Sequence, residues 1–245
     1  MLSSIPVKIK AGPNRPGKRS FAPNSKWGPP MKLGLPSRAA ASAIIACIAF
    51  APVHADPSTA PTVSSQAVNA KFDYCQTCHG RSAQGFRGVV PMPRLAGQPS
   101  EYIEKQLKAY IDDRLTEPVM RRVAQALSPA MVTALSAKFK ELNPKPLDIA
   151  PKDQIAAGKK IYDEGVPSQS VPGCTSCHGQ DAKGVGPFPR LAGQLHDYFI
   201  KTMVSWKKRG QDTSGPDTSA MMQPIARGLT EAQIAAVAAY VSQLQ

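Results

Sequence analysis

Apolar residues along the chain recur every three to four positions, which is the period of a helix. The C-terminal segment shows this best, because Ile234, Val237, Val241 and Leu244 share one helical face. No stretch alternates in the way that a half-buried strand requires. The pattern therefore predicts an all-α fold. Four further segments are predicted helices on the same ground: 65–74, 100–112, 154–164 and 196–208.

Residues that favour helix starts support this reading. Ser128 precedes Pro129, and Thr230 precedes Glu231, so each pair predicts an N-cap followed by the first residue of a helix. Ser100 is expected to cap the helix over 100–112 in the same manner.

The chain also repeats itself at an offset of about 100 residues, which indicates a duplicated domain rather than a solenoid. The segment 93–98, Pro-Arg-Leu-Ala-Gly-Gln, recurs without change at 189–194, and 120–142 aligns with 222–244 without a gap. We therefore expect two small domains with limited apolar cores. The predicted boundaries are a flexible lead over 56–65, a first domain over 66–142, a proline-rich linker over 143–152 and a second domain over 153–245.

Residues 1–55 are predicted to be a cleaved signal peptide. They hold 8 basic and no acidic residues, then an apolar run over 39–51, and end in Val-His-Ala. Met31 is an alternative start. An uncleaved anchor is one other reading, but the run is shorter than the roughly 20 residues that span a bilayer. A lipid-bearing Cys47 is another, but the apolar run continues beyond that cysteine. The sequence therefore predicts export to the periplasm.

Removal of this leader lowers the net charge that bears on the choice of binding partners. The full chain carries 30 basic and 17 acidic residues, and removing 8 basic residues leaves 22 − 17 = +5. The high basicity lies largely in the leader, so we expect no nucleic-acid partner. A mildly basic mature surface favours docking to an acidic redox protein.

Two motifs carry the candidate chemistry: Cys75-Gln-Thr-Cys78-His79 and Cys174-Thr-Ser-Cys177-His178. C-x-x-C-H is the attachment signature of c-type haem, in which both thiols add to haem vinyl groups and the histidine binds the iron. A zinc site and a disulfide framework are the alternatives. The histidine directly after each pair argues against the disulfide framework, and the motifs that recur in the rest of the chain argue against zinc. The motifs predict two covalently attached haem c groups.

Each iron needs a sixth ligand or an open site. Beyond the leader, the only histidine outside the motifs is His196, which we expect to be solvated, so two bis-histidine sites are excluded. Met120 and Met222 stand at matching positions, 41 residues after His79 and 44 after His178, and are the predicted axial ligands. Met221 is the neighbouring alternative to Met222. Three other methionines are expected to fill core: Met92, Met131 and Met203.

The repeated hexapeptide is expected to line the haem pockets. A backbone carbonyl at Pro93 or Pro189 is predicted to accept the Nδ1 hydrogen of the motif histidine. Arg94 and Arg190 either contact the haem propionates or are ordinary surface arginines.

Each half carries the haem motif, the hexapeptide and the candidate methionine in the same order, and in this it resembles a class I c-type cytochrome domain. The pair of halves resembles the di-haem cytochrome c4 family over most of residues 66–245. The resemblance implies two domains related by a pseudo-two-fold axis, with haems close enough for fast exchange. It also implies a periplasmic carrier, soluble or loosely membrane-associated, that passes electrons toward a terminal oxidase. Two departures stand out: Lys138 occupies the position of Tyr240, and the first helix of repeat 1 lacks the glycine of its counterpart.

The predicted function is one-electron transfer and not catalysis, because His/Met ligation saturates the iron and no substrate-binding motif stands out. The donor would be a quinol-oxidising complex or a dehydrogenase. Two alternatives stay open at this point. One is the haem subunit of a larger dehydrogenase, and the other is a di-haem peroxidase or thiosulfate-oxidising enzyme with one open iron.

Overall fold

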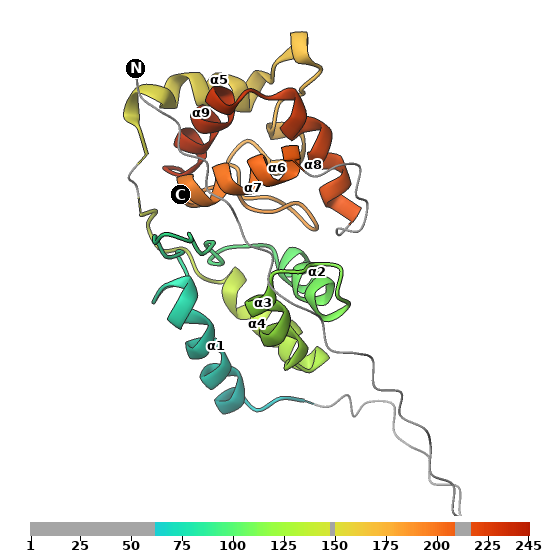
Figure 1. The fold of residues 1–245 in the computed structure, drawn as a ribbon. Helices are drawn as coiled ribbons and strands as arrows, with labels where there is room; N and C mark the ends of the chain where they lie inside the picture. The colour runs from blue at the N-terminus through green and yellow to red at the C-terminus, as the bar shows by residue number, and fades with distance from the viewer. Residues whose placement is uncertain (1–61, 148–149, 209–216) are drawn as a thin grey trace, which may run out of the picture. The chain divides into compact units, whose positions relative to one another are not determined.

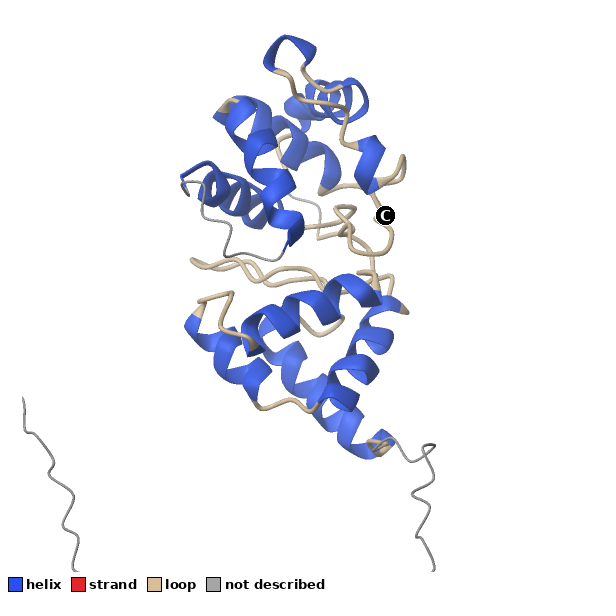
Figure 2. Cartoon of the chain, turned by 90° about the vertical axis from the view of Figure 1, so that its right-hand side faces the viewer, coloured by secondary structure: helices blue, strands red, loops and turns tan. Residues whose placement is uncertain are grey.

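A computed structural model describes residues 62–147, 150–208 and 217–245. The predicted signal peptide and most of the predicted lead lie outside these residues. Over the described ranges the chain is helical, with isolated β-bridges in place of strands, which confirms the all-α prediction (Figure 2). None of the helices in these ranges is long and apolar enough to cross a membrane.

Helices fall into two groups that follow the sequence repeat (Figure 1). Repeat 1 contains α1 (Ser65–His79), α2 (Ser100–Ile111), α3 (Pro118–Gln125) and α4 (Pro129–Lys140). Repeat 2 contains two short 3-10 turns, η1 (Lys152–Gln154) and η2 (Pro167–Gln169), and α5 (Ile155–Glu164), α6 (Thr175–His178), α7 (His196–Lys208), α8 (Asp217–Gly228) and α9 (Glu231–Val241).

Two of the three predicted caps are present. The Ser128 hydroxyl accepts the Met131 N–H at 3.2 Å at the start of α4, and Thr230 forms a capping box with Gln233 at the start of α9. The prediction for Ser100 was wrong. Ser100 is the first helical residue of α2, Pro99 precedes it, and no side-chain hydrogen bond caps this helix.

Hydrophobic periodicity did not predict α3 and α8, the helices that carry Met120 and Met222. The helix α3 is short, and α8 is interrupted by a proline. The helix α3 begins at Pro118, with the Glu117 carboxylate as its cap, and α8 holds Pro224 in its interior. A proline after the first turn is ordinarily read as a helix break, so the sequence pattern was misleading there.

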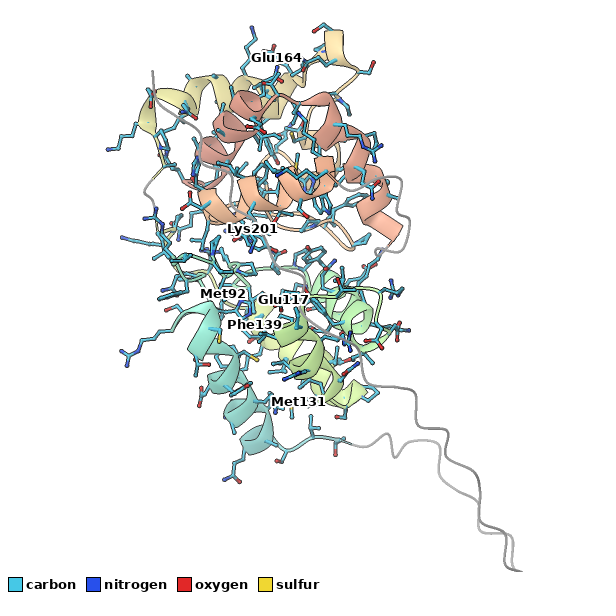
Figure 3. All side chains as sticks on the ribbon, viewed as in Figure 1. Met92, Glu117, Met131, Phe139, Glu164 and Lys201 are labelled. Atoms are coloured by element: carbon cyan, nitrogen blue, oxygen red, sulfur yellow. The ribbon has the colours of Figure 1, made fainter. Side chains whose placement is uncertain are left out.

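Each repeat has its own apolar core. In repeat 1 the rings of Phe72 and Phe139 pack with centroids 4.9 Å apart, in a cluster with Leu135 and Met131. Figure 3 labels two members of this cluster, Phe139 and Met131. In repeat 2 a larger cluster surrounds Tyr162, Ile234 and Val237. The first and last helices of each repeat meet at these clusters, so the loops between them are free to form the functional sites.

Candidate functional site

The two C-x-x-C-H motifs present their side chains in the same way. The motif of repeat 1 is the last turn of α1, whereas that of repeat 2 lies at and within the short helix α6. His79 and His178 are buried, at 6 % and 5 % exposure. The first cysteine of each motif is half-buried, the second is exposed, and all four thiols are free. Each motif therefore places a buried imidazole directly after one half-buried and one exposed thiol.

Both histidines are oriented by a hydrogen bond from the same ring nitrogen. Nδ1 of His79 lies 2.9 Å from the Pro93 carbonyl oxygen, and Nδ1 of His178 lies 2.9 Å from that of Pro189. These are the contacts that the repeated hexapeptide was expected to provide. Since the carbonyl only accepts, Nδ1 carries the hydrogen and Nε2 keeps a lone pair for a metal.

Burial keeps both imidazoles neutral. It lowers the pKa of His79 and of His178, and the hydrogen bonds to Pro93 and Pro189 oppose this only in part. A neutral imidazole with a free Nε2 is the form that ligates iron.

Backbone hydrogen bonds fix the loop after each motif. Gly85 N–H donates to the His79 carbonyl at 2.8 Å, and Gly184 N–H donates to the His178 carbonyl at 3.0 Å. Gly80 follows His79 with φ of 86°, a conformation open to glycine, and a Cβ at this position would collide with the Gly85 carbonyl. The backbone therefore turns directly after the histidine, toward the proline whose carbonyl accepts the hydrogen bond of the imidazole.

The candidate methionines lie on the two helices that periodicity missed. Met120 is half-buried in the first turn of α3, where its N–H bonds the Glu117 carboxylate at 2.8 Å. Met222 packs against the core of repeat 2, whereas its neighbour Met221 is 50 % exposed. This contrast favours Met222 over Met221. Met131 and Met203 are buried in the two cores, as expected of packing residues.

Arg94 and Arg190 are almost fully buried, at 1 % and 4 % exposure, so the surface reading of these arginines was wrong. Nε of each donates to an alanine carbonyl two residues on, at 3.0 Å and 2.9 Å. Their Nη2 groups bond the start of the predicted linker, at Pro144 O (3.0 Å) and Asn143 Oδ1 (3.2 Å). The linker is therefore held by both repeats.

One nitrogen of the Arg94 guanidinium has no partner among the described protein groups around it. Its Nη1 is buried without a hydrogen-bond partner in the described part of the chain. Burial, followed by the nearby charge of Arg190, lowers the pKa of Arg94 to about 10. A buried guanidinium of this kind calls for an anion. A haem propionate fits that requirement, and so the residues present fit the haem that the motifs predict.

Two glutamines join the repeats in a reciprocal pair of contacts that the sequence did not predict. Gln98 of repeat 1 donates to the Arg190 carbonyl at 2.8 Å and accepts the Arg190 N–H at 2.9 Å. Gln194 of repeat 2 accepts the Arg94 N–H at 2.9 Å and donates to the Arg94 carbonyl at 3.3 Å. The hexapeptide therefore binds its own copy, as in an interface between two-fold related subunits.

Other residues extend this contact surface between the repeats, which we call the seam. Tyr102 on α2 and Tyr198 on α7 stand at matching positions. Burial raises the pKa of Tyr102, and the charge of Tyr198 across the contact raises it further. His196 was expected to be solvated and is not, since its side chain is only 19 % exposed. Its Nδ1 lies 2.9 Å from Asp197 Oδ1, and its Nε2 is buried without a partner among the described residues.

The zinc alternative finds no support in this geometry. A structural zinc site takes four close ligands. Across residues 62–147, 150–208 and 217–245, no three His, Cys, Asp or Glu side chains gather closely enough to hold a metal ion. Each cysteine pair is instead followed directly by one buried histidine, which is the order of residues that haem attachment uses.

Comparisons with known proteins agree with this geometry. A family model described as Cytochrome c matches residues 155–245. The chain is 36% identical over 195 residues to Cytochrome c4 of Thiocapsa roseopersicina, covering 76% of this chain and 96% of the relative. It is 35% identical over 171 residues to a Thiosulfate dehydrogenase electron acceptor of Thiomonas intermedia (strain K12), covering 69% and 77%. The solved structure of Acidithiobacillus ferrooxidans cytochrome c4 aligns with a TM-score of 0.61 at 39% identity, covering 69% of this chain and 98% of that chain.

Proposed function

The chain belongs to the cytochrome c4 family and is a di-haem electron carrier with two covalent haem c groups, and from this premise we propose how it holds the haems and which proteins it serves. The bound haem iron supplies a one-electron couple. The chain's own residues decide how that iron is held, how far water reaches it and which proteins approach it.

The proposed ligand sets are His79 with Met120 and His178 with Met222. Cys75, Cys78, Cys174 and Cys177 are the proposed attachment points. The observation that carries this proposal is the matched pair of buried imidazoles, each with Nδ1 on a proline carbonyl and Nε2 free. A methionine opposite each imidazole would leave the iron no open position, and His/Met ligation raises the reduction potential.

Arg94 and Arg190 are proposed to hold the propionates. Both guanidinium groups are buried at the seam, and each backbone bonds a glutamine of the other repeat. Each guanidinium would pair with a propionate carboxylate of a bound haem. Because the backbone of each arginine is bonded to the other repeat, electron exchange between the haems would need no movement of one repeat against the other.

The proposed setting is the periplasm, reached through the predicted signal peptide, with the protein soluble or loosely held at the membrane. Electrons would arrive from a dehydrogenase or a quinol-oxidising complex and leave toward a terminal oxidase. The name of the Thiomonas relative, Thiosulfate dehydrogenase electron acceptor, supports a sulfur-compound dehydrogenase as one donor. It also favours the carrier over a haem enzyme, because that relative is named for accepting electrons.

A carbon monoxide titration of the purified, exported protein tests this proposal. Two saturated irons predict two covalent haems by intact mass and no carbon monoxide binding to the native reduced protein. Met120→Ala and Met222→Ala should each create one binding site. Ready binding by the unmodified protein, or fewer than two haems, would refute the saturated carrier and favour the enzyme with an open iron.

A further inference from the structure

The loop between His79 and Pro93 differs from its counterpart in repeat 2. Histidine and acceptor proline are 14 residues apart in repeat 1 and 11 apart in repeat 2. The extra residues of repeat 1 extend beyond a narrow base, called the neck, which two backbone hydrogen bonds close. Phe86 and Met92 exchange two backbone hydrogen bonds, of 3.1 Å and 2.9 Å, and residues 87–91 form the tip beyond them.

This tip exposes apolar side chains. Val89 is 105 % exposed and Val90 51 %, while Phe86 at the neck is 55 % exposed. The counterpart in repeat 2 is a tighter turn closed between Val185 and Phe188, with Val185 as its exposed apolar residue. Adjacent exposed apolar residues on an ordered loop are typical of an interaction site.

The charges around the two loops also differ. No acidic residue lies between Asp73 and Glu101, whereas Arg81 and Arg87 are both exposed on the loop of repeat 1. In repeat 2 the matching loop carries Asp181 and Lys183, which pair at 3.7 Å and cancel. One loop is therefore apolar and basic, and the other is close to neutral.

Arg87 is also linked to the seam. It lies 3.7 Å from Asp197 of repeat 2, with the two side chains 40% and 56% exposed. An exposed pair at this distance is weak and is screened by salt. Because the pair is weak, the guanidinium stays accessible to a carboxylate from another protein.

We propose that the tip together with its neck, residues 86–92, is the docking site for a redox protein whose contact surface has an apolar centre ringed by carboxylates. The inference rests on the proposed carrier function. Val89 and Val90 would meet the apolar centre, and Arg81 and Arg87 would meet the carboxylates. Because the same loop runs from the iron ligand His79 to Pro93, this partner would dock beside the haem of repeat 1. Repeat 1 is then the repeat through which this partner exchanges electrons.

Voltammetry on a designed surface tests the proposal. The probe is a gold electrode coated with mixed methyl-terminated and carboxylate-terminated alkanethiols, which offers apolar and acidic groups together. The variant is Val89→Ser with Val90→Ser, and the matched control is Val185→Ser. We expect adsorption of the double variant to weaken about tenfold, because two valines lose an apolar partner. The control should adsorb like the unchanged protein, and Arg81→Gln should reduce the salt dependence of adsorption.

Several results would overturn the docking proposal. Equal adsorption of the unchanged protein and the double variant would do so, as would an equal loss in the Val185→Ser control. Sedimentation of the unchanged protein as a dimer that the double variant does not form would assign the tip to a second copy. Loss of binding to anionic phospholipid vesicles in the double variant alone would assign it to a membrane.

The same samples separate this proposal from the carrier function. Haem content and both reduction potentials are measured in solution on each variant. If these are intact while docking is unaffected, the docking site is refuted and the carrier stands. If the unchanged protein lacks two reversible potentials, the carrier function itself fails.

Discussion

In repeat 2 the helix α5 packs against α9 (Figure 1). The two helices cross at Gly158, where a Cβ would overlap the Ala236 carbonyl, and the rings of Tyr162 and Tyr240 pack together beside this crossing. In repeat 1 the corresponding contact between α1 and α4 is made by the rings of Phe72 and Phe139, with Lys138 over the Phe72 ring at 4.8 Å. The same fold therefore closes its first and last helices by close backbone approach in one copy and by ring packing in the other.

The path from the first helix to the motif histidine differs too. In repeat 1, α1 continues without a break to His79. In repeat 2 a loop separates α5 from α6, and the Tyr162 hydroxyl donates to the Gly179 carbonyl at 2.6 Å. Phe72 has no hydroxyl and needs none, because the continuous helix already joins the packing residue to the motif. The geometry of the histidine is kept in both copies, while the means of supporting it has changed.

Removing either methionine should have the largest effect, and the two changes compare the repeats directly. Met120→Ala and Met222→Ala are each expected to lower one of two potentials by on the order of 100 mV, a part of the range that axial ligands control. The other potential should stay in place. A redox titration measures both, and two unchanged potentials in either variant would show that the ligand assignment is wrong.

Gly158→Ala should destabilise repeat 2 by about 3 kcal/mol, the upper end of the usual cost of overpacking. The added Cβ meets a backbone carbonyl that is held in α9 and cannot turn aside. Gln66→Ala, at an exposed position on α1, is the control and should change stability by less than about 0.5 kcal/mol. Urea unfolding followed by circular dichroism measures both. Equal, small effects would contradict the close crossing in repeat 2.

Gln98→Ala and Gln194→Ala should each lower the free energy of unfolding by about 2 kcal/mol, because each leaves a buried N–H and C=O unpaired. The reciprocal geometry predicts effects of similar size. Denaturant unfolding of the single variants is the measurement. A silent Gln194→Ala beside a costly Gln98→Ala would mean that the seam is not symmetric.

Tyr162→Phe should have the smallest effect, about 1 kcal/mol for one neutral hydrogen bond. Since Phe is the residue that repeat 1 uses, the packing of the ring should survive. Thermal unfolding, with Phe72→Tyr as the reverse exchange, shows whether the hydroxyl matters only where the helix is broken. A gain of stability from Phe72→Tyr would argue against that explanation.

Local patterns in the sequence were enough to predict the helical fold, the two haem motifs and the hydrogen bond from each histidine to its proline. These patterns did not predict contacts between residues of different repeats. Gln98 and Gln194 looked like ordinary polar positions, and only the identical repeat of their hexapeptide hinted at a shared role. For Arg94 the sequence left a propionate contact and a surface position both open, because burial of a charged group depends on partners that sequence spacing does not reveal. Met120 was proposed as a ligand by matching the repeats, although α3 itself gave too weak a hydrophobic period to be predicted.

The central claim is that two haem irons are each held by a buried histidine and a methionine on one chain. Absorbance recorded during a redox titration tests it most directly. The expected result is two reversible one-electron steps from low-spin haem, with a methionine–iron charge-transfer band in the far red of the oxidised protein. High-spin iron in either state, or a single step for the whole chain's iron, would contradict it.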